Sequence, residues 1–318
     1  MARRIAQLRQ QRPDWGARKL QRLLQGEGIE LPVITIHRVL LRQGLVRPAD
    51  RHPQAWQRFQ REAPKELWQM DFKSPKGGTD AVGPLAVIDD HSRYVIALQR
   101  TGTTRTEAVR ERLQTAFLDC GVPEAMLMDH GTPWWNAQAP SGWTQLQVWL
   151  KKQGIQCLFS GIRHPQTQGK VERFHLALEM ARRRRGRLEA EMEQAWLDEF
   201  RHEYNHLRPH EALGMQVPAS CWWASARRYD PHPPAWQYPQ GAEVKRLGGQ
   251  GQLKLQGARW EISQALAGEW VQLVRIADRI LVYYCNSLLK EIDVVAQRCT
   301  TVPRWTQPNC KGCPDNTV

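Results

Sequence analysis

The sequence predicts a mixed α/β domain that follows a helical unit and precedes a small β-rich unit. In the middle of the chain, apolar segments of strand character come first and then alternate with amphipathic helices, which is typical of an α/β domain. Near the N-terminus, apolar residues recur at helical spacing. After Pro218, short segments of alternating polarity are separated by Gly, Ala or Asp turns, which indicates a small β-barrel or sandwich.

The segment from Trp15 to Val46 predicts two helices joined by a short turn, because Gly26 and Gly28 interrupt the helical pattern. Its buried residues would be Leu20, Leu23, Leu24, Ile36, Val39 and Leu40. Any small helical hairpin would show this pattern, but the charge on the exposed faces favours a helix-turn-helix on DNA, with the second helix in the major groove. The candidate DNA contacts in this unit are Arg18, Lys19, His37, Arg38 and Arg42.

Composition favours a polyanionic partner. The 318 residues include 45 Lys and Arg against 32 Asp and Glu, a formal net charge of +13. Such an excess favours phosphates over an acidic small molecule. We find no apolar run of about 18 residues, the length that would indicate a membrane span. The seven cysteines are scattered, and we expect reduced thiols, including in the Cys310–Cys313 pair, rather than a disulfide framework or a zinc site.

The α/β domain is predicted from a regular series of segments. We expect strands over 67–72, twice within 85–99 around a turn at 89–93, over 125–128 and over 157–160. Helices are expected over 106–120 and 143–152, and a long helical stretch follows Gly169.

Three carboxylates stand out in this domain. Asp71 and Asp129 each end a buried strand, and Glu172 lies near the start of the long helical stretch. A carboxylate beside an apolar strand is costly to bury unless it is paired or binds a metal. Mg²⁺ prefers oxygen ligands, and two-metal sites catalyse phosphoryl transfer. Lys170 would hold DNA phosphates beside this site. Two other acids, Asp89 and Asp90, also follow an apolar strand, but we interpret them as turn residues.

Five motifs together resemble one family, the integrase-core transposases of bacterial insertion sequences, which are related to retroviral integrases. They are "LWQMDFK", "VIDDHSRYVIA", "MDHGTPWWN", "HPQTQGKVERFH" and "YNHLRPHEALG". The resemblance implies a ribonuclease-H-like fold and a catalytic, metal-binding triad of Asp71, Asp129 and Glu172. It also implies Mg²⁺ as cofactor, two ions per site with Mn²⁺ able to substitute, and cutting of element ends that are then joined to target DNA.

Further expectations follow from this resemblance. Lys170 and Arg173, on faces of the helix next to Glu172, would meet DNA. The protein would act as a homo-multimer on inverted-repeat ends and target DNA in the cytoplasm of a bacterium, associated with the nucleoid. The spacing from Asp129 to Glu172 is longer than is usual in the family, and we expect the extra residues in Asn136–Gly142.

Two other functions stay open at this point: an idle transposase-derived DNA-binding protein, and a ribonuclease-H-like nuclease. Trp134 and Trp135 could stack on a splayed base or pack on the core. The run from Arg182 to Arg185 could be a solvated face or contact phosphates. The predicted domains are a helix-turn-helix unit (1–48), a linker (49–64), the catalytic core (65–218), a β-barrel-like unit (219–295) and a tail (296–318).

Overall fold

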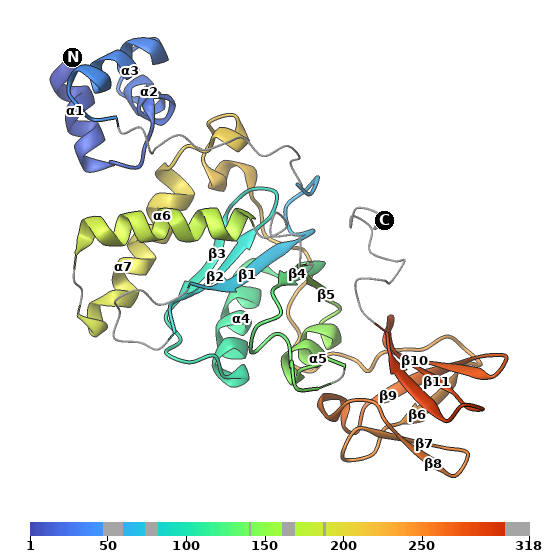
Figure 1. Cartoon of the computed structure of the whole chain (residues 1–318). Helices are drawn as coiled ribbons and strands as arrows, with labels where there is room; N and C mark the ends of the chain where they lie inside the picture. Colours follow the sequence, from blue (N-terminus) through green and yellow to red (C-terminus); the bar gives the residue numbers. More distant parts are fainter. Residues whose placement is uncertain (47–59, 74–81, 140, 161–168, 187–188, 303–318) are drawn as a thin grey trace.

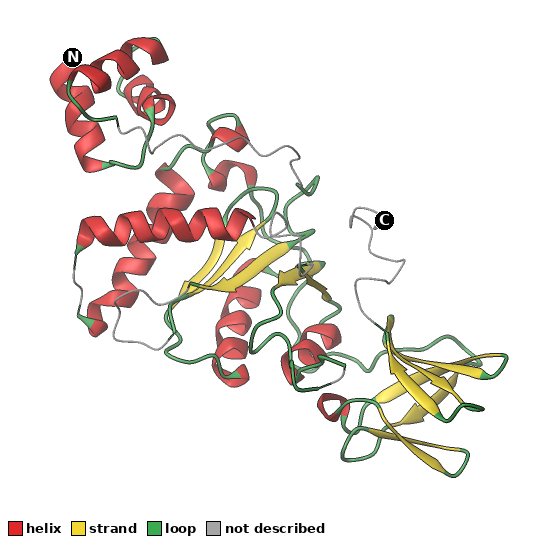
Figure 2. Cartoon of the chain, in the orientation of Figure 1, coloured by secondary structure: helices red, strands yellow, loops and turns green. Residues whose placement is uncertain are grey.

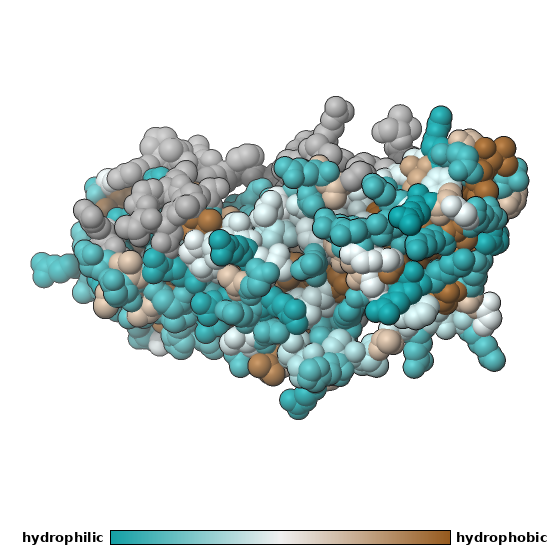
Figure 3. Space-filling model, turned by 90° about the horizontal axis from the view of Figure 1, so that it is seen from below, coloured by the Kyte–Doolittle hydropathy of each residue, from teal (hydrophilic) through white to brown (hydrophobic). Residues whose placement is uncertain are grey.

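The computed structural model describes residues 1–46, 60–73, 82–139, 141–160, 169–186 and 189–302. A helical N-terminal unit and a β-rich C-terminal unit lie at opposite ends of a central α/β core (Figure 1). No helix among the described residues is long and apolar enough to cross a membrane. The face of the molecule in Figure 3 is largely hydrophilic, with scattered apolar patches.

The N-terminal unit contains three helices, α1 (Ala2–Gln11), α2 (Ala17–Gly26) and α3 (Val33–Arg42). The helices α2 and α3 were predicted, whereas α1 was not. All three enclose one apolar core, formed by Ile5, Leu8, Trp15, Leu20, Leu24, Ile36 and Leu40. The residues Leu23 and Val39, predicted to be buried, lie partly exposed at its edge.

The central sheet has five strands in the order β3-β2-β1-β4-β5. The strands β1, β2 and β3 are antiparallel neighbours, whereas β4 pairs parallel with both β1 and β5. This arrangement is that of the expected ribonuclease-H-like core. The strands are β1 (Trp68–Phe72), β2 (Leu85–Asp89), β3 (Val95–Gln99), β4 (Ala125–Met128) and β5 (Gln156–Phe159).

Helices cover both faces of this sheet (Figure 2). One apolar cluster joins the sheet to α4 (Thr106–Cys120) and α5 (Gln145–Lys152), and another joins its opposite face to α6 (Gly169–Arg185) and α7 (Ala190–His202). In β1, Trp68 and Met70 belong to the α4–α5 cluster. Because side chains alternate along a strand, Gln69 and Asp71 point to the face that α6 covers.

The core continues past the predicted boundary at Pro218. After α7 the chain forms a π-helical turn (Glu203–Leu207) and two short 3₁₀ helices (Glu211–Leu213 and Pro218–Cys221). It then runs back along the core, where the Trp222 ring stacks on Tyr94 with centroids 4.2 Å apart. The amide of Val122 donates to the carbonyl of Arg227 at 2.7 Å.

The C-terminal unit consists of a five-stranded sheet, β12-β11-β10-β9-β6, and a two-stranded sheet, β7-β8. The six strands β6 to β11 lie in the range predicted to be β-rich, and β12 lies in the range predicted as a tail. Apolar residues of both sheets form one core, which Trp143 and Val148 of the α5 region join. The strands are β6 (Glu243–Arg246), β7 (Gln252–Leu255), β8 (Ala258–Glu261), β9 (Trp270–Ile276), β10 (Arg279–Tyr284), β11 (Ser287–Asp293) and β12 (Arg298–Thr301), with a 3₁₀ turn at Gln264–Leu266.

Candidate active site

The sheet register brings Asp71 and Asp129 to the same edge. In the parallel pair of β1 and β4, Trp68 aligns with Met126 and Gln69 with Leu127. Continued by two residues, this register sets Asp71 beside Asp129, the first residue after β4. Adjacent strands lie about 4.8 Å apart, so the two acids are neighbours.

Asp129 is fixed by the turn that follows β4. Its Oδ1 accepts a hydrogen bond from the Gly131 amide at 2.8 Å. A Cβ at position 131 would lie 3.0 and 3.1 Å from the two carboxylate oxygens of Asp129. Position 131 is therefore occupied by the one residue type that leaves room for this carboxylate.

Helix α6 brings Glu172 to this edge. His175 on the buried face of α6 lies with its Nδ1 3.6 Å from Oδ2 of Asp71. Residues three apart are neighbours on a helix surface, so Glu172 lies at the exposed rim next to that contact. Strand β1, the end of β4 and the first turn of α6 thus converge with one predicted triad residue each.

The electrostatics of Asp71 reflect its two acidic neighbours as well as its burial. Burial is the largest of the causes that raise the pKa of the Asp71 carboxyl to about 7, followed by the charge of Asp129 and then by the charge of Glu172. The backbone N–H of Phe72 and the charge of Lys73 act in the opposite direction. Burial, aided by Lys73, lowers the pKa of His175 to about 3, so its imidazole is neutral.

The donor set suits a hard cation, because all three groups offer carboxylate oxygens. In the described part of the chain, no three His, Cys, Asp or Glu side chains lie close enough together to hold a metal ion. The three acids therefore face one edge of the sheet without forming a closed cluster.

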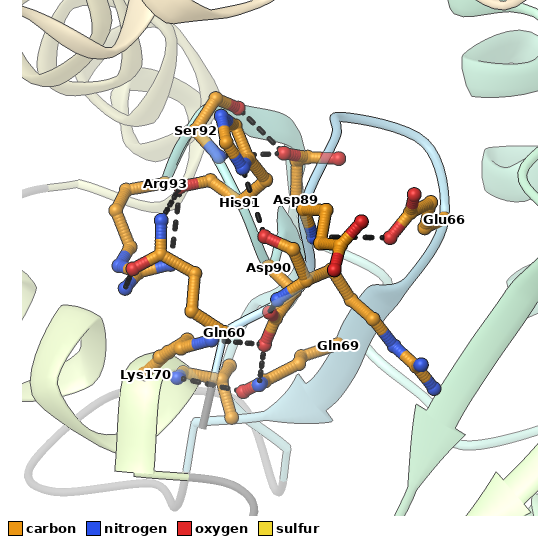
Figure 4. Close-up of polar contacts among 12 residues, drawn as sticks. Gln60, Glu66, Gln69, Asp89, Asp90, His91, Ser92, Arg93 and Lys170 are labelled. Carbon is orange, nitrogen blue, oxygen red and sulfur yellow. Dashed lines mark hydrogen bonds and ion pairs between the residues drawn. The ribbon is translucent and has the colours of Figure 1, made fainter. Parts of the chain in front are cut away.

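Lys170 forms an ion pair inside the protein, whereas the sequence predicted that its side chain would contact DNA phosphates. Its ammonium group pairs with Asp90, whose side chain is 0% exposed (Figure 4). Burial lowers the pKa of Lys170 to about 8, although Asp90 acts to raise it. The amide of Gln69, also fully buried, donates to the same Asp90 oxygen at 2.8 Å. Gln69 was not predicted as a site residue; the available signal is an amide at a buried position of an apolar strand.

Asp89 is the turn residue that the sequence predicted. Its Oδ1 accepts from the backbone N–H and the hydroxyl of Ser92, at 2.8 and 2.6 Å. Its Oδ2 accepts from the Lys65 amide at 2.7 Å. Burial raises the pKa of Asp89. Its carboxylate organises the β2–β3 turn.

The other candidate DNA contacts are distributed over two units. On α6, Arg173 is exposed beside Glu172. On α3, Arg38 and Arg42 are exposed and His37 is half-buried.

The two candidates on α2 lie near charged residues that follow α7. Arg18 is exposed, 3.7 Å from Glu211. Lys19 is half-buried, and burial, together with the charge of Arg208, lowers its pKa to about 7.

The candidate aromatic and arginine contacts have structural roles. Trp134 is 1% exposed and stacks on Phe72, which confirms the packing alternative. Trp135 is half-buried and lies edge-on to His130 and Phe159. In the arginine run, Arg182 pairs with Glu193, Arg183 with Glu179 and Arg184 with Asp14, whereas Arg185 is exposed.

The predicted insertion forms a closed loop. The amide of Asn136 donates to the carbonyl of Gly142 at 3.1 Å, so the ends of Asn136–Gly142 meet. Residues 161–168, which include His164, lie outside the described residues, as do Cys310 and Cys313.

Comparison with known proteins agrees with this architecture. Models of the integrase core domain match residues 61–165 and 153–218. These matches support an integrase core domain over residues 61–218, of the kind found in integrase-core transposases and in the related retroviral integrases. The transposase of transposon Tn552 from Staphylococcus aureus is 29% identical over 127 residues, which are 35% of this chain and 25% of the relative. The match thus spans a quarter of that protein.

Several chains of viral integrase structures match this chain at low identity and with TM-scores below 0.5. A chain of the simian T-cell lymphotropic virus intasome covers 94% of this chain and 96% of its own length, at 15% identity and a TM-score of 0.43. The catalytic core of BIV integrase covers 49% and 92%, at 20% identity and a TM-score of 0.38. The HTLV-2 integrase core covers 50% and 97%, at 14% identity and a TM-score of 0.37.

Proposed function

We propose that this protein is a DNA transposase that binds insertion-sequence ends and catalyses metal-dependent strand cleavage and strand transfer into target DNA. The observation that carries the proposal is the convergence of Asp71, Asp129 and Glu172 from three elements of an integrase core. Burial, with the negative charges of Asp129 and Glu172 acting in the same direction, raises the pKa of Asp71 to about 7, which supports a carboxylate site for cations.

In this proposal Asp71, Asp129 and Glu172 would hold two Mg²⁺ ions, whose chemistry when bound would be to favour the attacking and the leaving oxygen of phosphoryl transfer. Asp71 must lose its proton to act as a ligand. Asp129 is held in place by the Gly131 amide. His175, neutral beside Asp71, excludes water from the inner side of the site.

DNA would meet the basic residues around this site. Arg173 is next to Glu172 on the exposed side of α6 and suits a phosphate near the reacting bond. In the helical unit, α3 would enter the major groove with His37, Arg38 and Arg42, while Arg18 and Lys19 of α2 contact the backbone. Because two ends must be joined in concert, we propose a homo-multimer on DNA.

The test uses the purified protein, duplexes copied from the DNA flanking its gene, a plasmid target, and Mg²⁺ or Mn²⁺. Glu172→Gln is compared with Glu199→Gln, the same change at an exposed position of α7. We expect joining by the wild type and by Glu199→Gln but not by Glu172→Gln. A loss of about 10³-fold or more is the expected scale for a residue of the chemical step.

Other results of this assay would favour one of the two alternative functions. Nicking without joining would indicate a ribonuclease-H-like nuclease. Tight DNA binding with no cleavage would indicate an idle transposase-derived protein. Equal joining by Glu172→Gln and the wild type would exclude Glu172 from the chemistry.

A further inference from the structure

A buried polar network lies directly behind the candidate active site, with Asp90 at its centre (Figure 4). Oδ1 of Asp90 accepts from Nε2 of Gln69 at 2.8 Å and pairs with the ammonium group of Lys170. Oδ2 accepts from the Arg61 amide at 2.8 Å. The side chains of Asp90 and Gln69 are 0% exposed, and that of Lys170 is 15% exposed.

This network joins the two elements that carry Asp71 and Glu172. On β1, Gln69 is two residues before Asp71 and points to the same face of the sheet. On α6, Lys170 is two residues before Glu172. The amide of Val171, between them, donates to Oε1 of Gln69 at 3.3 Å. Each carboxylate is therefore attached to the network through a nearby residue of its own element.

Glu172 needs such support because it has little packing of its own. Its side chain is exposed, so its position depends on where the first turn of α6 lies. The apolar contacts of α6, through Val171 and Phe174, are not directional and tolerate small shifts of a helix. Hydrogen bonds and ion pairs require particular geometry, and the low dielectric of the interior strengthens them.

A buried ion pair is also a poor source of stability for a protein core. Apolar residues of similar volume often stabilise a core as much or more, and the better-attested use of a buried pair is to fix register. The charge pair of this network lies at the first turn of α6, which carries Glu172 and must be in register with Asp71 on β1.

We propose that Lys170 and Asp90, with Gln69, are positioning residues that fix the first turn of α6 so that the Glu172 carboxylate meets those of Asp71 and Asp129. The inference rests on the proposed function. It assigns Lys170 an internal role in place of the phosphate contact that the sequence predicted.

The test measures binding of Mn²⁺ alone to the full chain, from the electron paramagnetic resonance signal of free Mn²⁺. Lys170→Met should weaken binding about 10-fold or more, the scale found for partners that orient metal ligands. Lys170→Arg, which keeps the charge, should restore most of it. The matched control is Lys152→Met, which breaks an ion pair with Glu269, 2.5 Å long, between α5 and the C-terminal unit. It should bind Mn²⁺ as the wild type does.

A second measurement separates positioning from phosphate contact. Affinity for a DNA duplex in metal-free buffer should be the same for Lys170→Met and the wild type. Lower DNA affinity with unchanged Mn²⁺ binding would overturn the proposal and restore the phosphate role. Asp90→Asn, which keeps the side-chain shape, is measured in parallel so that the proposal can be judged even if Lys170→Met folds poorly; we expect it to weaken Mn²⁺ binding as well.

Glu172→Gln separates this inference from the proposed function. If it weakens Mn²⁺ binding while Lys170→Met and Asp90→Asn do not, the metal site stands and the positioning role is wrong. If the wild type binds no Mn²⁺, or if Glu172→Gln binds as the wild type does, the metal site itself is wrong and the positioning role falls with it.

Discussion

At the scale of single residues, Gly131 matters because of the space it leaves. Its backbone φ is not in the left-handed region, so the backbone itself would accept alanine. The restriction comes from Asp129, whose carboxylate oxygens lie 3.0 and 3.1 Å from the position of a Cβ. An added methyl group would push this carboxylate or break its bond to the Gly131 amide.

We therefore predict that Gly131→Ala lowers metal-dependent DNA nicking about 10-fold or more, because a misplaced reacting group costs catalysis far more than stability. The melting temperature should stay close to that of the wild type. Gly249→Ala is the control, since a Cβ there meets nothing within 4 Å. Full activity of Gly131→Ala would show that Asp129 does not need its observed position.

A second residue-scale prediction concerns His210. Burial lowers its pKa from 6.5 to about 2, and the positive charges of Lys19, Arg208, Arg93 and Arg173 add to this effect. The folded state thus binds this proton less readily than the unfolded state. Stability from this group is complete above the unfolded pKa of 6.5 and is lost as the pH falls below it.

Between about pH 7 and about pH 5, His210 should cost the wild type about 2 kcal/mol of unfolding free energy. In His210→Asn that loss should be absent, while the contribution of His175 is common to both proteins. Urea unfolding at the two pH values measures the difference. Equal pH dependence in the two proteins would show that folding does not lower the pKa of His210, so that the folded protein carries a protonated His210 at pH 5.

The three acids of the proposed triad could be singled out in the sequence because each is part of a local motif. The surroundings of this triad could not be predicted. The partner of Lys170 is Asp90, 80 positions away in the sequence, and nothing local in either segment indicates that they meet. A lysine beside a catalytic glutamate has the same sequence signature whether it contacts phosphate or a buried carboxylate. Only the fold distinguishes these roles.

At the scale of elements, segments with a clear apolar pattern could be predicted, whereas α1 and β12, which have few apolar positions, could not. Helix α1 has few apolar positions, and its buried residues Ile5 and Leu8 matter only because α3 is present to cover them. Strand β12 has the sequence RCTT, in which Cys299 is the only apolar residue, so it shows no alternation of apolar and polar positions. The helical stretch after Gly169 divides into α6 and α7, with Gly186 at a φ of 81° after α6.

The π-helical turn after α7 makes a contact that no local pattern indicates. Oδ1 of Asn205 accepts from the Val95 amide at 2.8 Å, and its Nδ2 donates to the Val95 carbonyl at 3.1 Å. Asn205 is 2% exposed. Its amide thus takes the place of a strand partner at the start of β3.

Asn205→Ala should lower the free energy of unfolding by about 2–3 kcal/mol, because it leaves buried backbone groups without these partners. Urea denaturation with an unchanged m-value would measure this. Gln138→Ala, at an exposed position, should change stability by no more than about 0.5 kcal/mol. A similarly small effect of Asn205→Ala would mean that water replaces the side chain.

At the scale of the whole molecule, one acid forms the most buried of the ion pairs described between the N-terminal unit and the core. Asp14, with its side chain 2% exposed, lies 2.6 Å from Arg208 and 3.4 Å from Arg184. Although burial acts to raise it, these two arginines hold the pKa of Asp14 below its ordinary value. Arg184 also donates to the Gln11 carbonyl at 2.8 Å, so the end of α6 and the segment after α7 both contact the same turn of the N-terminal unit.

Removing this acid should release the unit. Asp14→Ala leaves the guanidinium of Arg208, 12% exposed, without its carboxylate, and breaking a buried pair in this way costs about 3–5 kcal/mol. In Asp14→Ala this cost applies only to the docked arrangement, because the guanidinium of Arg208 becomes hydrated when the units separate. Small-angle X-ray scattering should therefore show a larger radius of gyration, while circular dichroism stays unchanged because neither apolar core is altered. Glu27→Ala, which breaks the exposed pair with Arg4 inside the unit, should leave the scattering profile as it is. An identical profile for Asp14→Ala and the wild type would show that other contacts hold the two units together.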